Sequence, residues 1–156
     1  MRMASWRVVF GACVVLSLSS CTLAENVGPV ALSVVDGEMA LAFCKDQSID
    51  SIRVLQLAPG ADRVSGWQSI WEARGPVPVV FGEIIVVRDS MDQFLQSTIF
   101  DGFEGAAGFQ YEVDVRLDDG TFYGPVLVSP ASGLEEGKWV TTSKQTVEEP
   151  CEGISP

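Results

Sequence analysis

The chain has 156 residues, of which 21 are acidic and 10 basic, and its formal net charge at pH 7 is −11. Nucleic acids and anionic lipid headgroups attract Lys- and Arg-rich surfaces, so this excess of carboxylates argues against both as partners. The chain contains no histidine. This excludes the usual general base, the commonest zinc ligand and every Ser-His-Asp or Cys-His nucleophile.

The amino terminus has the pattern of an export signal. Arg2 and Arg7 give it a basic start, an apolar run covers Val8–Leu18, and small residues precede Cys21. A membrane-spanning helix needs roughly 18 or more apolar residues, so this run is too short to cross a bilayer. It suits a signal peptide that is removed after export.

The residues Leu18-Ser19-Ser20-Cys21 resemble the lipobox of bacterial lipoproteins. The resemblance implies cleavage before Cys21, a lipid on its thiol and acylation of the new amino terminus. The alternative is an ordinary secretory signal that is cut near Ala24. We therefore expect a signal peptide at 1–20, a lipidated cysteine and short tether at 21–28, and one domain at 29–156. The protein is then anchored through Cys21 to the extracytoplasmic face of the cell membrane.

The size and charge of the mature protein follow from this cleavage. Residues 1–20 include two of the ten basic residues and none of the 21 acidic ones, so their removal leaves 136 residues and a charge of −13. That length is enough for one domain with a proper core but hardly for two.

The cysteines predict one disulfide. With Cys13 in the leader and Cys21 lipidated, Cys44 and Cys151 remain as a pair in an oxidising compartment. A bridge between them would join the carboxyl-terminal tail to an early strand. A redox role is less favoured, because neither cysteine belongs to a Cys-x-x-Cys motif.

The first half of the domain alternates as β-strands do. Two alternating runs, 30–35 and 39–44, flank Asp36-Gly37 and predict a hairpin. Strands are also expected at 51–57 and 68–74, the second with Trp71 facing the core and Ile70 on the opposite face.

The middle of the chain is less regular. Two prolines exclude a central strand at 75–78, whereas 83–88 is apolar on both faces and favours a central strand. The segment 89–95 could form a short helical turn, and 97–100 another strand.

The strictest alternation covers 109–117. After a turn at 118–120, a second run covers 121–129, and its interruption at Gly124-Pro125 indicates a bulge or an edge strand. A last strand is expected at 139–142. About eight short strands separated by turns predict an all-β protein, a single antiparallel β-sandwich.

The alternating Phe109, Tyr111, Val113, Val115 and Leu117, with Trp71 upstream, resemble the F-strand and tryptophan pattern of immunoglobulin-like or fibronectin type III domains. The resemblance implies such a sandwich for this chain. The chain departs from the pattern by extra length at 89–108 and in the tail.

No catalytic, metal or cofactor site is expected from the motifs. A carboxylate pair of the glycosidase kind stays open, but the sequence does not locate one. Asp89 with Asp92, and Asp118 with Asp119, do not match a calcium loop and suit a helix cap and a hairpin turn better. No glycine-rich phosphate cradle follows a strand, so no bound nucleotide is expected.

Four aromatic residues are the candidates for partner binding. Phe100 and Phe103 flank Asp101-Gly102 in a glycine-rich connection, and Trp67 and Tyr123 are the next candidates. Exposed aromatics at the end of a sandwich suit a sugar or protein surface. The alternative is that the two phenylalanines pack over the edge of the core.

The leading functional hypothesis is a non-catalytic envelope lipoprotein that contacts another envelope protein or a wall polymer. One alternative is a carboxylate-dependent enzyme that acts on cell-wall carbohydrate, which would require facing carboxylates in a cleft with a perturbed pKa. The other is an accessory ligand-binding lipoprotein of a transporter, for which the domain is small.

Overall fold

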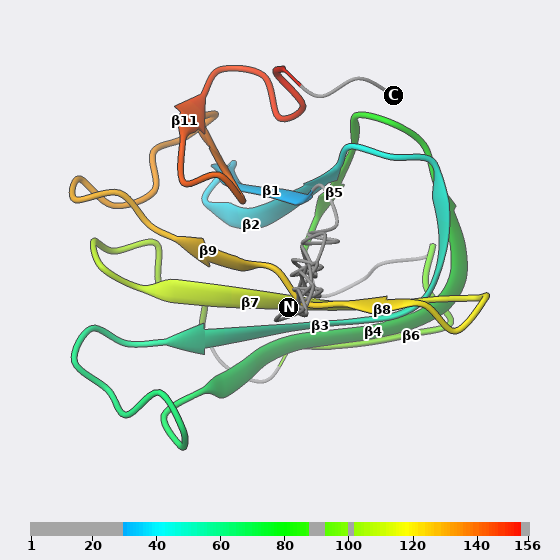
Figure 1. Ribbon diagram of the computed structural model, residues 1–156, viewed down its shortest axis with the longest axis horizontal. Coiled ribbons are helices and arrows are strands. Elements are labelled where there is room, and N and C mark those ends of the chain that lie inside the picture. The colour runs from blue at the N-terminus through cyan, green and yellow to red at the C-terminus, as the bar shows by residue number, and fades with distance from the viewer. Residues whose placement is uncertain (1–29, 88–92, 100–101, 154–156) are drawn as a thin grey trace, which may run out of the picture.

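The computed structural model describes residues 30–87, 93–99 and 102–153. These residues form two antiparallel β-sheets that face each other and contain no helix (Figure 1). The predicted all-β antiparallel sandwich is confirmed, with eleven strands in place of the expected eight or so. The run expected at 121–129 forms two short strands on either side of Gly124-Pro125, Phe122–Tyr123 (β8) and Val126–Val128 (β9), and Thr146–Val147 (β11) is a strand that the sequence did not predict.

The first sheet has five strands in the order β11-β10-β1-β2-β5. Their bounds are Val30–Val35 (β1), Glu38–Phe43 (β2), Glu83–Val86 (β5), Trp139–Thr141 (β10) and Thr146–Val147 (β11). The second sheet has six strands in the order β6-β4-β3-β7-β8, with β9 also paired to β7. Their bounds are Gln47–Leu57 (β3), Gln68–Val79 (β4), Gln96–Ile99 (β6), Gln110–Leu117 (β7), Phe122–Tyr123 (β8) and Val126–Val128 (β9).

Each sheet places strands from distant parts of the chain side by side. The neighbours β1, β2 and β5 form the central and edge part of the first sheet, and β3, β7 and β8 are neighbours in the second. The extra length noted in the sequence includes β6, which lies beside β4, β10, which lies beside β1, and β11, which lies beside β10. These strands thus lie toward an outer edge of each sheet.

The predicted hairpin is present at β1 and β2. Val35 pairs with Glu38, and the two residues between them, Asp36 and Gly37, have φ values of 55° and 77°. Positive φ at both central positions is what a type I′ turn requires, and Asp-Gly tolerates it. The turn therefore fixes the register that buries the alternate side chains of both strands.

Trp71 is a core residue, as predicted. It has no exposed surface, its indole Nε1–H donates a hydrogen bond to Ser97 Oγ at 2.9 Å, and its ring meets that of Phe94 edge-on at 5.8 Å. The buried N–H is thereby satisfied, which avoids the desolvation cost of an unpaired donor.

The expected outward position of Ile70 is wrong. Val54 pairs with Trp71 and Leu55 pairs with Ser69, so Ile70 is the extra residue of a β-bulge and has no partner on β3. A bulge shifts the alternation by one residue. As a result both Ile70 and Trp71 are buried in the core, at 2% and 0% exposure.

Strand β4 continues past Arg74 to Val79, through the two prolines where the sequence predicted its end. Pro76 and Pro78 are exposed, whereas Val77 and Val79 are buried. The neighbouring β6 pairs only with residues up to Arg74, so β4 is the edge of the sheet at its prolines. The missing ladder donors therefore cost no hydrogen bond on that side.

The predicted central position of 83–88 is also wrong, because β5 is an edge strand. Its outward-facing apolar residues are Ile84, which is 46% exposed, and Val86, which packs against a second small cluster. This cluster lies on the outer face of the five-stranded sheet. Contact with it, rather than with a neighbouring strand, explains part of the apolar character of 83–88. Residue 88 lies outside the described residues, as does most of the predicted helical turn at 89–95.

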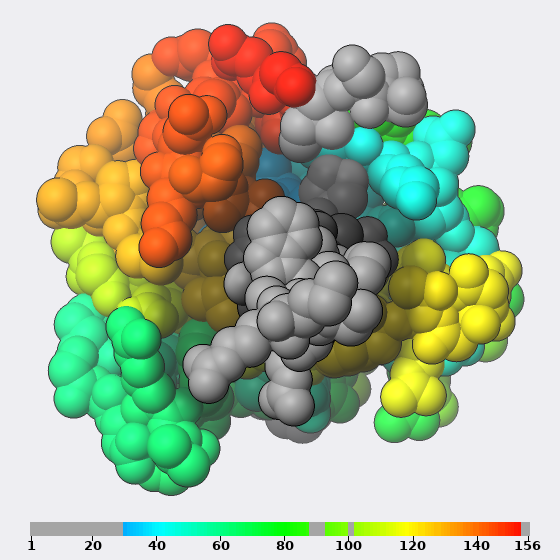
Figure 2. Space-filling view, in the orientation of Figure 1, coloured from blue at the N-terminus to red at the C-terminus, as the bar shows by residue number. Residues whose placement is uncertain are grey.

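The second cluster contains Ala31, Ala40, Ala42 and Trp139, with Val147 against it. Trp139 and Val147 belong to the last two strands, so the carboxyl-terminal segment covers small side chains of β1 and β2. This segment forms the orange and red part of the surface in Figure 2.

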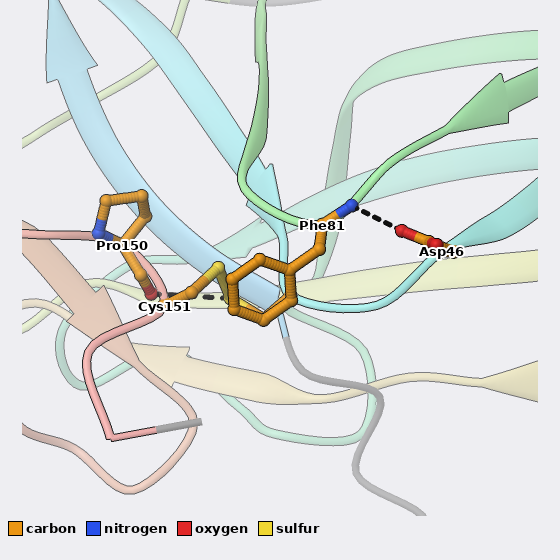
Figure 3. The surroundings of a disulfide bond; sticks show 5 residues. Asp46, Phe81, Pro150 and Cys151 are labelled. Atoms are coloured by element: carbon orange, nitrogen blue, oxygen red, sulfur yellow. Dashed lines mark hydrogen bonds between the residues drawn. A yellow bond between two sulfur atoms is a disulfide. The ribbon is translucent and has the colours of Figure 1, made fainter. Parts of the chain in front are cut away.

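The disulfide Cys44–Cys151 is confirmed. It joins residues 107 apart in sequence, with a Cα–Cα distance of 5.3 Å. Figure 3 shows its surroundings, in which the carbonyl oxygen of Pro150 lies 3.4 Å from Cys44 Sγ and the backbone N–H of Phe81 donates to Asp46 Oδ1 at 2.7 Å. The bridge therefore ties the end of the carboxyl-terminal segment to the end of β2.

Candidate functional site

Phe103 packs against the core and does not form a free aromatic surface. It is half-buried, and its ring lies 5.6 Å from that of Tyr111. The hydroxyl of Tyr111 donates a hydrogen bond to the backbone carbonyl of Glu104, which ties the loop to β7. Burial raises the pKa of Tyr111, so this hydroxyl keeps its proton. Phe100 lies outside the described residues.

Trp67 and Tyr123 lie at opposite ends of the six-stranded sheet. Trp67 is half-buried beside the end of β3, and its indole N–H donates to the carbonyl of Arg63 at 3.1 Å. Tyr123 is 8% exposed beside the start of β3, where Gln47 Nε2 donates to its hydroxyl oxygen at 2.6 Å. The described candidate aromatics thus do not form one patch.

A wide depression of about 740 Å³ lies on the outer face of the six-stranded sheet. We call it the outer-sheet depression. It is lined by Asp50, Ser51, Ile52, Arg53, Glu72, Ala73, Arg74, Gly75, Leu95, Gln96, Asp114, Arg116 and Phe122. Three of the five arginines that follow Cys21 are among these residues, although the protein as a whole is acidic. Three acidic residues, Asp50, Glu72 and Asp114, line the depression beside these arginines.

One row of charged residues, at positions paired between neighbouring strands, crosses the depression. Arg53 on β3 pairs with Glu72 on β4 and with Asp114 on β7. Its Nε and Nη2 both donate to Asp114 Oδ2, at 3.1 and 2.5 Å. The Asp114 side chain is only 10% exposed and that of Arg53 50%. The hydrogen bond to Asp114 is the largest cause that raises the pKa of Arg53, and burial opposes it.

Glu112 lies two residues before Asp114 on the same strand and hence on the same face. Burial is the main cause that raises the pKa of Glu112, the charge of Asp114 raises it further, and Arg53 lowers it. A Cβ on Gly124 would lie 2.8 Å from Asp114 Oδ1 and 3.4 Å from Glu112 Oε1. The absence of a side chain at Gly124 therefore leaves room for both carboxylates.

A second row runs beside the first. Ser51 on β3 pairs with Arg74 on β4 and with Arg116 on β7, and Arg116 pairs in turn with Phe122. Both arginines are exposed, and neither forms a salt bridge within the described part of the chain. Neighbouring strands are about 4.8 Å apart, so the two arginine Cα atoms are about 10 Å apart across Ser51. We call this the Arg74–Ser51–Arg116 row.

The two rows differ in what they offer a ligand. In the first row the positive charge of Arg53 is already neutralised by Asp114, with Glu72 and Glu112 nearby. In the second row the guanidinium groups are available to an oxyanion from outside. The face as a whole is polar and open, which suits binding of an exposed partner better than enclosure of a small molecule.

Within 30–87, 93–99 and 102–153, no three metal-ligating side chains come together, and no helix is long and apolar enough to cross a membrane.

The sequence did not point to this site, because its residues come from separate strands. The alternation in 109–117 placed Glu112, Asp114 and Arg116 on one polar face, and that was the signal available. The pairing of β3 with β4 and β7, which brings Arg53 and Arg74 to the same face, follows only from the strand register.

Comparison with known proteins gives no relative from which a role can be transferred: no protein-family model, curated protein or solved structure matches the chain.

Proposed function

We propose that the protein is a lipid-anchored module on the extracytoplasmic face of the cell membrane, which binds an envelope protein or a wall polymer through the outer-sheet depression. The observation that carries the binding surface is the pair of exposed arginines, Arg74 and Arg116, in a wide polar depression of an acidic protein. The leader and its lipobox-like quartet ending at Cys21 support the anchor.

The point at which the described domain begins supports this proposal. The described domain begins at Val30, which pairs with Phe43 at the Cys44 end of the five-stranded sheet. The depression lies on the outer face of the other sheet. Lipid attached at Cys21 would therefore leave the depression free to meet a partner.

Site-specific photo-crosslinking in intact cells tests the binding surface. A photoreactive amino acid replaces Phe122 or Gln96, which line the depression, or Ile84, which is 46% exposed on β5 of the other sheet. We expect both positions in the depression to capture the same neighbour and Ile84 to capture none. Capture from Ile84 alone, or equal capture from all three positions, would contradict the proposed surface.

Metabolic labelling tests the anchor separately. The wild-type chain should incorporate radiolabelled palmitate and partition into detergent, and Cys21→Ala should abolish both. Cys13→Ala is the matched control, because this cysteine belongs to the expected discarded leader. Unchanged labelling of Cys21→Ala would show that the protein is not a lipoprotein of the expected kind.

A second candidate function is supported by Glu112. A glycosidase of the common kind uses two carboxylates about 5 to 10 Å apart, one with a raised pKa. Glu112 has a raised pKa and Asp114 lies on the same face, but the ion pair with Arg53 engages the second carboxylate. Release of reducing sugar from isolated cell wall, abolished in Glu112→Gln and retained in Glu104→Gln, would favour the enzyme over the module.

A further inference from the structure

The Arg74–Ser51–Arg116 row has the chemistry of a subsite for a carboxylate. Two exposed guanidinium groups, which form no salt bridge among the residues that the structure describes, flank a serine on the middle strand. Arginine is suited to carboxylates because its planar fork donates two parallel hydrogen bonds. We propose that this row binds the carboxylate of an acidic glycan, an inference that rests on the proposed function and names its ligand.

The charge around the row favours a glycan whose carboxylates are spaced apart. Asp50 and Glu72 line the same depression, and the chain carries a net charge of −11. A densely charged polyanion would bring further negative groups against these carboxylates, at separations where salt screens little. A carboxylate on one sugar, with neutral sugars on either side, meets the arginines without that repulsion.

The rest of the surface suits sugar rather than peptide. Phe122 pairs with Arg116 at one end of the row and is 59% exposed, so its ring can support the face of a sugar. Gln96 pairs with Arg74 at the other end, and Glu72 offers oxygens to hydroxyl groups. The five strands from β6 to β8 span about 19 Å, which fits an extended oligosaccharide.

The test is a calorimetric titration of the full-length protein in detergent. The probe is a hexasaccharide in which glucuronate alternates with N-acetylglucosamine. Its carboxyl methyl ester and the peptide triglutamate serve as comparison ligands, because the first removes only the charge and the second keeps the charge without the sugar. We expect the hexasaccharide to bind at least about tenfold more tightly than either, since a charge-assisted hydrogen bond accounts for such a factor.

Substitutions then test whether the two arginines contact the carboxylate of the hexasaccharide. Arg74→Gln and Arg116→Gln should each weaken the hexasaccharide by about tenfold or more and leave the ester unchanged. Arg63→Gln is the matched control, because Arg63 is exposed in the β3–β4 loop and lies outside the depression. It removes the same charge and should have no effect.

Three results would overturn the inference: equal binding of acid and ester, equal weakening by Arg63→Gln, or tighter binding of triglutamate. The crosslinking in cells separates this inference from the proposed function. If Phe122 still captures a neighbour while no hexasaccharide binds, the glycan subsite is wrong and the binding surface stands. If neither occurs, both are wrong.

Discussion

Arg53 directs two nitrogens at a single carboxylate oxygen, Asp114 Oδ2, and leaves the other oxygen, Oδ1, 2.8 Å from the position that a Cβ on Gly124 would occupy. The carboxylate is nearly buried and the guanidinium half-exposed. The two partners of this ion pair therefore depend on each other unequally. Removing Arg53 leaves the buried negative charge of Asp114 without a partner. Removing the Asp114 carboxylate leaves an arginine that water can still solvate.

Arg53→Gln should consequently destabilise the protein more than Asp114→Asn. We expect a loss of about 2 kcal/mol in the free energy of unfolding for Arg53→Gln, since it leaves a desolvated carboxylate, and about 1 kcal/mol for Asp114→Asn. Urea unfolding at pH 7 measures both. Arg63→Gln on an exposed loop is the control and should change nothing. The opposite order of the two losses would contradict the unequal dependence.

Gly124→Ala should cost about 1 to 2 kcal/mol, because the new Cβ overlaps with a carboxylate that Arg53 holds in place. Its closest contact would be Asp114 Oδ1 at 2.8 Å. In an Asp114→Ala background the overlap is gone, so the same substitution should cost much less. A double-mutant cycle of urea unfolding free energies gives this difference directly. Equal costs in the two backgrounds would place the strain elsewhere.

The raised pKa of Glu112 predicts a stability that depends on pH. A carboxyl whose pKa is higher in the folded state stabilises the fold while it is protonated, and this contribution is lost as pH rises through the folded pKa. Glu112→Gln should therefore stabilise the protein at pH 7, by under about 1 kcal/mol because the group is partly solvated. At pH 4, below the ordinary glutamate pKa of 4.5, the gain should vanish. Urea unfolding at both pH values tests this, and an equal gain at both would contradict the cause.

Loss of the disulfide should be the most destabilising change proposed. The bridge closes a chain segment between residues 107 apart, and the chain-entropy model gives about 4.7 kcal/mol for a loop of about 100 residues. Measured effects are often smaller, so we expect about 3 to 5 kcal/mol for the Cys44→Ala, Cys151→Ala double variant. Urea unfolding without reductant measures the loss. Alkylation of the unreduced wild-type protein should find neither thiol reactive.

The sequence predicted the features that depend on local chemistry. The Asp36-Gly37 turn, the alternation of β7 and the core position of Trp71 each follow from a few neighbouring residues, and all three are confirmed. The disulfide was predicted because the other two cysteines were assigned to the leader and to lipidation.

The features that failed depend on distant parts of the chain. Ile70 turns inward because of where β4 pairs with β3, and 83–86 is an edge strand because no other strand of the described residues lies beyond it in that sheet. The outer-sheet depression combines residues from five strands, and a register shift of one residue would send their side chains to the other face. The register between these strands cannot be read from the residue pattern of any one strand.

The pairing of β1 on both sides has a mechanical consequence. A lipid anchor would pull the domain at Val30, where β1 pairs with β2, and the next two residues of β1 also pair with β10. Because ladder hydrogen bonds run across the strands, a force along β1 shears many of them together instead of opening them one at a time. The bond from Cys44 to Cys151 closes the same end of the sheet covalently. If the chain is anchored at Cys21 as proposed, tension applied at Val30 would therefore load these hydrogen bonds together.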